Sequence, residues 1–580
     1  INSSKFRDMH ANIDCQRYLR NIIVTCPTAM TLKEQRALRQ AAKDASRLLS
    51  AIMPSLPEMT ITPDPDKLRP TDDITEMENR GGRYDEAFAS QLVYLYAEMT
   101  QRYGGRVSQF FDLKGHYRKE LEEIGFQGKS LTIGTIDIGA GTTDIMVTAY
   151  GQKTEGRITP VPLYYDSFFT AGDDILHNVI RDIILEGNDG ESPDMGSITS
   201  ALTARIMAMT TEQLLSIPRV ADTAEYRATV DDIRNAITPE EVETLKRHLI
   251  HELMHHFFAD DSAKMSERDR RCRVDFCTQV STPVSQFFLE LLKQQRPSKL
   301  YTFDELFPKE KPASYLLDHF AYHFGFRFED LTWRYDPAAI GNIVRDTMEP
   351  LIKVLSVVMY AHHCDILVLS GRPTNLEPLT ELFLKYIPIS PSRLVRLNQY
   401  RVGRWFPLAT EEGYFQENQK AVVAVGAEVG YIASTVGYNG LVLDFSVLAK
   451  RMKPTSCYMG KYDEELLEVP SAFLTPENGT ANLRNISVFP YYIGCKQYNA
   501  PKYQARPMYA IYNNSGLPQL NIMIQRNYYE DRELLTLEDV TDMEGDSIDP
   551  GKVELRLQTL AHDGEFWMDK GAFTLKIQEN

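Results

Sequence analysis

The chain has 580 residues, more than a single hydrophobic core usually holds, so several domains are expected. Apolar residues make up 43% and charged residues 25%, which excludes a wholly disordered chain. The net charge of −17 argues against a nucleic-acid-binding role, because neutralising phosphates requires a basic face.

The first zone, residues 1–130, is predicted to combine a short strand with helices. Residues 21–27 form a β-rich run that ends at a proline, and residues 31–34 have the pattern of a capping box that opens a helix. Residues 54–83 are polar and rich in proline, so we expect a loop or an insertion there. Residues 84–103 carry apolar side chains at helical spacing, which predicts another helix.

A second zone begins at residue 131 with an apolar strand, a glycine-rich turn and another strand. Residues 187–335 are charged, helical in pattern and rich in histidine, which predicts an inserted helical subdomain. From 336 to 447 strands and helices alternate again, so 131–447 is predicted to form one lobe around the insert. Residues 448–580 contain short alternating runs between turn residues, which is typical of an antiparallel β domain.

The most informative segment is Asp-Ile-Gly-Ala-Gly-Thr-Thr-Asp at residues 137–144, between two predicted strands. The small residues at 139–141 let backbone N–H groups approach an anion closely, and the hydroxyl groups of Thr142 and Thr143 can add donors. Asp137 can hold a magnesium-bound water or the attacking water, because Mg²⁺ keeps most of its waters and prefers carboxylate contacts. A plain β-hairpin is the alternative, since one glycine-rich turn is a weak signal.

This segment resembles the second phosphate motif of the ATPase superfamily of actin, sugar kinases and heat-shock chaperones. Other segments resemble further motifs of that superfamily, in the same order along the chain. They are residues 22–36 (strand, proline and helix of the first lobe), 85–90 (first connecting helix), 169–174 (turn after the phosphate motif), 347–355 (helix before the adenosine motif), 366–374 (adenosine motif) and 419–427 (second connecting helix). The whole pattern, with its helical insert and tyrosine-rich tail, further resembles the bacterial SrfB virulence-factor family.

The resemblance covers about residues 20–435 and implies a fold. This is an α/β, actin-like (ribonuclease H-like) two-lobe ATPase fold with a helical insert and a C-terminal antiparallel β domain. Residues 1–130 would then be the remainder of the first lobe and 131–447 the second lobe, with the insert at about 187–335. Residues 448–580 would form the β domain. Its position is similar to that of a chaperone substrate-binding domain, but a generic β sandwich that packs on the ATPase lobes is the preferred interpretation.

Carried over residue by residue, the resemblance implies ATP or ADP with Mg²⁺ as ligands. Asp137 would serve the metal through water, and Asp137, Glu86 and Thr142 would be the catalytic residues. The nucleotide would be bound by Gly139, Ala140, Gly141, Thr142 and Thr143 at the phosphates, by Gly172 and Asp173 near the terminal phosphate, and by Ser370, Gly371 and Arg372 around the adenosine. Slow Mg-dependent ATP hydrolysis would follow, because phosphoryl transfer needs mainly positioning and charge neutralisation.

The sequence departs from the superfamily pattern in two ways. The first phosphate motif should precede the strand at residue 22 and is not found. Either the chain is an N-terminally truncated piece, as the initial Ile1 indicates, or the protein has lost that half of the site. In addition, Ala140 and Ser370 replace glycines, and Arg372 stands where small polar residues are usual.

We therefore expect a virulence-associated, chaperone-like or actin-like nucleotide-dependent switch that acts on a protein partner or client. A pseudo-ATPase interaction scaffold is the alternative. A third reading is a zinc metallopeptidase, because His251, Glu252 and His255 form an HExxH motif that puts both histidines on one helix face. The extended form of that motif fails at Phe258 and Asp261, so histidine pairs on an amphipathic helix are the commoner explanation.

Smaller features complete the expectations. No apolar run approaches the roughly 18–20 residues of a membrane-spanning helix, so no membrane span is expected. The seven cysteines are scattered without a CxxC pair, and no signal peptide is visible, which favours a reducing compartment. With the SrfB resemblance this implies the bacterial cytoplasm, and secretion without a classical signal is the alternative. The run His362-His363-Cys364 precedes a strand and is expected to serve packing rather than metal binding.

Overall fold

The structure is a computed structural model, and it describes most of the chain. The described residues are 18–28, 30, 32–53, 55–68, 84–123, 125–154, 156–187, 197–219, 223–259, 265–407, 409–415, 421–445, 455–464, 466–500, 502–529, 532–557 and 567–576. The chain divides into two compact units. The first comprises residues 1–171, 351–374 and 383–559, and the second comprises 172–350, 375–382 and 560–580.

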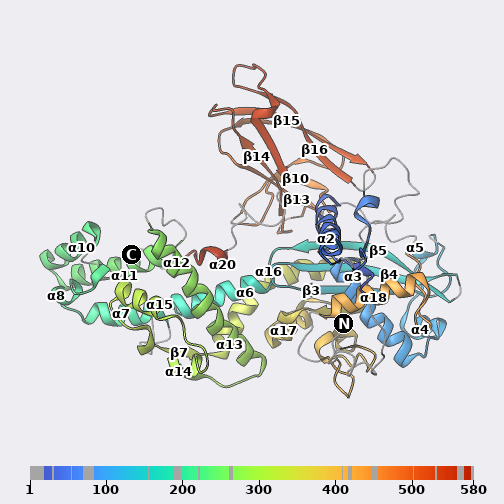
Figure 1. Ribbon diagram of the computed structural model, residues 1–580, viewed down its shortest axis with the longest axis horizontal. Helices are drawn as coiled ribbons and strands as arrows, with labels where there is room; N and C mark the ends of the chain where they lie inside the picture. Colours follow the sequence, from blue (N-terminus) through green and yellow to red (C-terminus); the bar gives the residue numbers. More distant parts are fainter. Residues whose placement is uncertain are drawn as a thin grey trace. The chain divides into compact units, whose positions relative to one another are not determined.

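A five-stranded mixed sheet is the centre of the first unit (Figure 1). Its strands, in spatial order, are β5 (Arg157–Phe168), β4 (Thr143–Thr154), β3 (Leu131–Ile138), β8 (Ile366–Ser370) and β9 (Leu394–Arg396). The first three form an antiparallel meander, whereas β8 and β9 run parallel to β3. Every residue of β3 and β8 is buried, which explains their nearly continuous apolar sequences.

Two helices, α3 (Glu86–Ala97) and α18 (Ala421–Thr435), pack together beside this sheet. Their backbones touch at Gly426, where a Cβ atom would lie only 1.9 Å from the carbonyl oxygen of Ala89. Buried Gln91 fixes α3 to the sheet, because its side-chain amide donates to the carbonyl oxygens of Ile133 (3.3 Å) and Met146 (2.9 Å). The chain continues from α3 into a π-helical turn, η4 (Glu98–Arg102).

The N-terminal part of the first unit corrects one expectation. The proline-rich region that was predicted to be a loop contains strand β2 (Thr60–Thr62) and the 3₁₀ turn η1 (Pro65–Leu68). Strand β2 pairs in parallel with β1 (Asn21–Ile23), and α2 (Leu32–Ile52) connects them. The predicted helix over 32–52 is confirmed, while Thr31 of the capping box lies outside the described residues. Helices α4 (Val107–Lys114) and α5 (Lys119–Glu122) complete this part.

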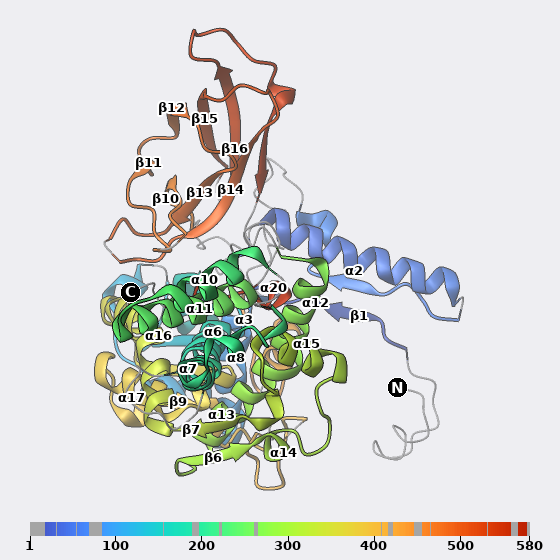
Figure 2. The same ribbon diagram turned by 90° about the vertical axis from the view of Figure 1, so that its left-hand side faces the viewer.

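The C-terminal part of the first unit is antiparallel β structure, as its alternating runs predict. One sheet has the order β11 (Ala472–Leu474), β10 (Tyr458–Lys461), β13 (Tyr491–Lys496), β14 (Arg506–Asn513) and β17 (Val553–Leu557). The other has the order β12 (Thr480–Ile486), β15 (Leu520–Tyr529) and β16 (Arg532–Thr541) (Figure 2). The apolar residues of both sheets share one core, and we call this part the β domain.

The second unit is mainly helical. Its main helices are α6 (Gly172–Val179), α7 (Ile198–Ala208), α8 (Thr211–Leu214), α10 (Ala224–Asn235), α11 (Pro239–Phe258), α12 (Glu267–Phe276), α13 (Thr282–Lys293), α14 (Phe303–Leu306) and α15 (Ser314–Phe324). A two-stranded hairpin pairs β6 (Lys299–Thr302) with β7 (Thr332–Tyr335). Helices α16 (Pro337–Ala361) and α17 (Glu377–Tyr386) each belong partly to this unit.

A C-terminal segment joins the second unit from beyond the β domain. It contains α20 (Trp567–Lys570), and the rings of Trp567 and Phe573 pack on His177 at centroid distances of 5.2 and 5.0 Å. Farther along, the Lys576 Nζ atom pairs with Asp182 at 3.0 Å. The last described residues are therefore an integral part of the helical unit.

Among all described helices, none has both the length and the apolar character that a bilayer crossing requires.

Candidate functional site

The carboxyl ends of β3 and β8 lie side by side, and the chain leaves them in opposite directions. Asp137 of β3 and Ser370 of β8 are register partners in this parallel pair. From β3 the chain turns back into β4 on one side, whereas β8 leads to β9 on the other side. Open α/β sheets bind ligands at such switch points, in the crevice outside the carboxyl ends of the strands. The strand topology alone therefore makes this edge of the sheet a candidate ligand-binding site.

Asp137 lies at this edge with little contact to solvent. Its side chain is 9% exposed, and Oδ2 accepts a hydrogen bond from the Ser90 hydroxyl at 3.0 Å. The Ser370 hydroxyl also bonds to this carboxyl group. Helix α3 and strand β8 therefore both fix the carboxylate that the sequence assigns to the metal or the water.

Asp144 lies directly opposite Asp137 in the β3–β4 ladder, so both carboxyl groups belong to one face of the sheet. Its Oδ1 atom accepts from the Thr28 backbone N–H and from the Ser167 hydroxyl, each at 2.8 Å. Its Oδ2 atom accepts from the Thr142 hydroxyl at 2.9 Å. Asp144 thus ties the β1–α2 connection, the glycine-rich turn and strand β5 together.

Asp85 and Glu86 begin α3 near the same face. The Asp85 Oδ1 atom caps the helix by accepting from the Phe88 N–H at 2.7 Å, and it also accepts from the Thr28 hydroxyl at 3.3 Å. The Asp85 Oδ2 atom is buried and has no hydrogen-bond partner among the described residues. A buried carboxylate oxygen without a partner is costly, so it marks a place where a ligand or water is expected.

These carboxyl groups share perturbed acidities. Burial raises the pKa of Asp85 to about 8, that of Glu86 to about 7 and that of Asp137 to about 6. The nearby Asp144 carboxylate contributes to each of these increases, and burial raises its own pKa as well. The raised pKa values mean that the ionised carboxylates are disfavoured here. A bound cation would stabilise the ionised form and lower these pKa values.

The glycine-rich turn uses several of its donors internally. The Gly139 N–H donates to the Thr142 carbonyl oxygen at 2.8 Å, which closes the turn. The Thr142 hydroxyl donates to Asp144, and the Thr143 hydroxyl donates to the Thr170 carbonyl oxygen at 2.7 Å. Ala140 and Gly141 are exposed at the tip. In this structure the two threonine hydroxyls therefore bond to the protein, and the tip of the turn faces solvent.

Gly371 lies against the end of β3 and cannot be larger. Its φ is +90°, and a Cβ atom would lie 2.0 Å from the Ile138 carbonyl oxygen and 3.0 Å from Asp137 Oδ1. Ser370 is buried against Asp137, whereas Arg372 is exposed in the 3₁₀ turn η8 (Arg372–Asn375). The three residues predicted to surround the adenosine thus have different environments. Ser370 faces the carboxyl groups, Gly371 lets its backbone approach the end of β3, and Arg372 faces solvent.

Gly172 and Asp173 begin α6, which belongs to the second unit. Burial raises the pKa of Asp173. The structure therefore brings together Asp137, Glu86 and the turn, with Gly371, within the first unit, and it assigns Gly172 and Asp173 to a separate compact body. No individual role was expected for Asp85, Ser90, Asp144 or Ser167. The available signal was that the first three stand at the ends of the segments 85–90 and 137–144.

The HExxH motif lies on α11. The rings of His251 and His255 stack on each other with a centroid distance of 3.9 Å. Within the described ranges, no group of three or more His, Cys, Asp or Glu side chains is arranged to hold a metal ion. A zinc site at this motif therefore has no third ligand in that part of the chain. A water-bound Mg²⁺ at Asp137 has no such requirement, because Mg²⁺ needs only one or two carboxylates beside substrate phosphates.

Fold and site together define a mixed α/β protein with buried carboxyl groups gathered at the switch point of its sheet. The family model described as virulence factor SrfB matches residues 1–212 and 227–574. The chain therefore belongs to the SrfB family. No curated protein matches the chain.

Proposed function

We propose that the chain is an ATP-binding, nucleotide-dependent switch of the actin and heat-shock-chaperone superfamily. Residues 1–130 are assigned to the first lobe, 131–447 to the second and 448–559 to an output domain, while residues 560–580 belong to the helical unit. The observation that carries the proposal is the group of buried carboxyls at the switch point, beside a glycine-rich turn and Gly371. This combination suits a magnesium–phosphate ligand better than it suits a structural core.

The arrangement of the resembling segments supports the actin-like fold. The strand of the expected adenosine motif pairs in parallel with the strand that delivers Asp137. The expected first and second connecting helices, α3 and α18, pack on each other through Ala89 and Gly426. Residues 419 and 420 of the second one lie outside the described residues. Segments hundreds of residues apart along the chain thus lie together, which supports the proposed actin-like fold.

The residues present fit Mg²⁺ and a nucleotide. Asp137 would hold the metal through water, and the metal would supply neutralisation of phosphate charge. The exposed tip at Ala140 and Gly141 offers backbone close to the carboxyl groups, where a phosphate chain needs it. Glu86, whose pKa is raised to about 7, is suited to accept a proton from an attacking water at neutral pH. Slow hydrolysis is proposed on this basis.

The route from the turn to the β domain runs through the end of β5. Ser167 bonds to Asp144 of the site, and its neighbour Asp166 accepts a hydrogen bond from the Tyr503 hydroxyl of the β domain. The hydroxyls of Tyr503 and Tyr164 are 2.6 Å apart. These side chains are mostly buried, so a shift of the turn is transmitted through a packed, hydrogen-bonded contact rather than through solvent.

A second connection runs parallel to it. Thr143 donates to the Thr170 carbonyl oxygen, and the Thr170 hydroxyl accepts from the Gln504 side-chain amide at 2.8 Å. Tyr503 and Gln504 are consecutive residues of the β domain, and they contact Asp166 and Thr170 at the end of β5 and just beyond it. We infer that nucleotide state changes the presentation of the β domain to a protein partner or client in the bacterial cytoplasm.

A pseudo-ATPase scaffold is the second candidate. The engaged hydroxyls of Thr142 and Thr143 favour it, because they donate to protein groups instead of being open to a phosphate. Under this reading the fold is kept and the ligand is lost. Nothing in the described residues favours zinc peptidase chemistry at His251 and His255, so that function is not proposed.

Calorimetric titration of Mg-ATP and Mg-ADP into the full chain tests the proposal. We expect binding that weakens at least tenfold in both Asp137→Ala and Gly141→Val, because each change alters the carboxylate or the tip of the turn. Asp166→Asn is the matched control, since this buried aspartate lies on the same sheet but bonds to Tyr503. The absence of binding in a wild-type protein that includes its natural N-terminus would refute nucleotide binding and leave the scaffold.

A further inference from the structure

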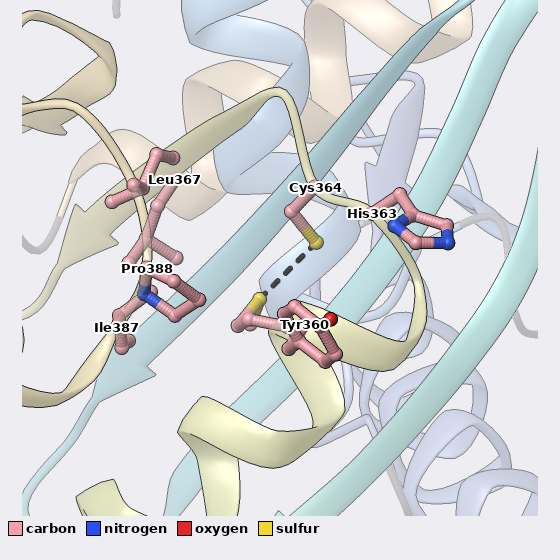
Figure 3. A pocket seen from close by; sticks show the side chains of 8 residues that line it. Tyr360, His363, Cys364, Leu367, Ile387 and Pro388 are labelled. Atoms are coloured by element: carbon pink, nitrogen blue, oxygen red, sulfur yellow. Dashed lines mark hydrogen bonds between the residues drawn. The ribbon is translucent and has the colours of Figure 1, made fainter.

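Outside the candidate site, the structure shows a small cavity and an exposed apolar helix face. The cavity has a volume of about 270 Å³ and lies between the end of α16 and the segment after α17. In its wall the Cys364 thiol donates a hydrogen bond to the Met359 Sδ atom at 3.3 Å, and most of the other lining side chains are apolar (Figure 3). The thiol therefore has its partner within the protein, and no ligand is assigned to this cavity.

The helix face belongs to α2, which buries polar side chains and exposes apolar ones. Gln35, Arg39 and Ser46 are buried against the protein. The large apolar side chains at the other positions are each between 42% and 68% exposed, and they are Leu38, Leu48, Leu49, Ile52 and Met53. A surface helix normally has the reverse arrangement, with its apolar stripe toward the core. Something outside the first unit is therefore expected to cover α2.

Hydrogen bonds hold the polar side of α2 inward. The Arg39 guanidinium donates to the Val24 carbonyl oxygen at 3.2 Å and to Gln35 Oε1 at 2.9 Å. The Ser46 hydroxyl accepts from the Met59 N–H at 2.7 Å. These contacts fix the rotation of the helix about its axis, because turning the leucines inward would leave the buried polar groups without partners.

The exposed apolar positions follow a heptad pattern. They are spaced three, four, three and four residues apart, and they are Leu38, Ala41, Ala45, Leu48 and Ile52. This is the spacing by which two helices pack against each other in a coiled coil. All five residues are exposed, so they form one continuous stripe along the helix, which we call the α2 stripe. An exposed apolar stripe of this kind marks an interaction site.

The α2 stripe is complementary to itself when two copies run antiparallel. Its first four positions are symmetric about residue 43. A two-fold axis there places Leu38 opposite the partner's Leu48, and Ala41 opposite the partner's Ala45. Leucines then meet leucines at both ends, while the alanines let the two helices approach closely in the middle. An interface with two-fold symmetry requires such a self-complementary surface.

The charges on α2 favour the antiparallel orientation over the parallel one. Glu34 continues the α2 stripe in the first turn, so a parallel pair would place two Glu34 carboxylates side by side. An antiparallel pair separates them by 18 positions, or about 27 Å, and also opposes the two helix dipoles. Asp44, near the axis, accepts from Gln40 at 2.9 Å and lies 3.6 Å from the Arg47 guanidinium, which offsets its charge.

We propose that the α2 stripe is the contact surface of an antiparallel, two-fold symmetric homodimer. This inference is independent of the proposed nucleotide function. Helix α2 has 21 residues, so its face is about 31 Å long and about 10 Å wide, which gives a footprint of about 300 Å² per copy. A standard stable interface buries about 800 Å² per partner. The dimer is therefore weak and dissociates on dilution.

Sedimentation velocity of the full chain over about a hundredfold range of concentration tests the proposal. We expect a reversible monomer–dimer equilibrium for the wild type. Leu48→Glu should weaken dimerisation at least tenfold, because the symmetry places a carboxylate at both ends of the contact. Leu38→Glu, the residue opposite in the pair, should have the same effect. Leu113→Glu is the matched control: this leucine of α4 is 72% exposed, and its substitution should leave the equilibrium unchanged.

Cysteine cross-linking tests the register. Ala41→Cys and Ala45→Cys chains, mixed and mildly oxidised, should form a disulfide-linked dimer faster than either variant does alone, since only the mixed pair places the two thiols directly opposite. The wild type, oxidised in the same way, measures the contribution of its own cysteines. Fastest cross-linking within Ala41→Cys alone would show a parallel pair and overturn the proposed arrangement.

Two further outcomes would overturn the dimer itself. If the wild type sediments as a monomer at every concentration, the α2 stripe does not join two copies and another chain segment or protein covers it. If Leu48→Glu and Leu38→Glu dimerise as the wild type does, the contact lies elsewhere. Both leucines are exposed in the single chain, so each variant should keep the circular dichroism spectrum of the wild type.

Discussion

Asp137→Asn should stabilise the chain at neutral pH while removing nucleotide binding. The Asp137 pKa is raised from 3.8 to about 6, which corresponds to about 3 kcal/mol of unfavourable interaction for the charged form at 1.36 kcal/mol per pKa unit. The amide is uncharged and of similar shape. It gives up one hydrogen bond from Ser90 or Ser370, worth about 1 kcal/mol. The expected net gain is about 2 kcal/mol at pH 8.

The sign of the pH dependence follows from the direction of the shift. Because the folded pKa lies above the unfolded one, the folded chain retains a proton at pH values where the unfolded chain has released it. The cost of the Asp137 carboxylate is therefore fully present above about pH 7 and has mostly disappeared by about pH 4. The advantage of Asp137→Asn should shrink over that window and become a small loss near pH 4.

Hydrogen exchange of β3 peptides in increasing urea is the suitable assay, because a chain with two compact units does not unfold in one two-state step. Asp166→Asn is again the control: its pKa is likewise raised to about 6 by burial, yet its substitution should leave Mg-ATP binding intact. A purely structural role for Asp137 predicts destabilisation at every pH. Weaker protection of β3 in Asp137→Asn at pH 8 would therefore refute the functional reading.

Three further substitutions test the architecture. Tyr503→Phe removes the hydroxyl that donates to Asp166. We expect unchanged ATP affinity and loss of the nucleotide-dependent change in hydrogen exchange of the β domain. If that change persists, the contact between Asp166 and Tyr503 does not carry the signal. Gly371→Ala places a Cβ 2.0 Å from the Ile138 oxygen at positive φ and should cost about 3 kcal/mol or more in urea unfolding of this unit. Gly426→Ala pushes against the Ala89 oxygen and should cost about 1–3 kcal/mol in the same assay; wild-type stability would show that α3 and α18 separate easily.

Local sequence patterns predicted the elements that carry their own signal. The apolar run of β3, the glycine-rich turn and the helix over 32–52 are recognisable because periodicity and turn chemistry act over a few residues. Strand β2 was missed, since its three residues lie in a proline-rich stretch and are stabilised only by pairing with β1.

The partners within the site could not be read from the sequence for the same reason. Thr28 and Ser167 reach Asp144 across 116 and 23 residues, and no short-range pattern encodes such contacts. The threonine hydroxyls were expected to face phosphate, yet a hydroxyl takes the nearest good acceptor, which here is Asp144 or the Thr170 carbonyl. Residue types revealed the chemistry available at the turn, and only the fold decides which donors stay open.

The C-terminal segment on the helical unit has a consequence for how the chain is made. Lys576 and Asp182 are 394 positions apart, so a ribosome that adds about 5–20 residues per second reaches Lys576 about 20–80 s after Asp182. Throughout that interval His177 lacks the aromatic cover that Trp567 and Phe573 provide. The helical unit is thus begun before, and completed after, strands β8 and β9 and the β domain, and a nascent chain must keep this incomplete surface from other apolar surfaces while those parts are synthesised.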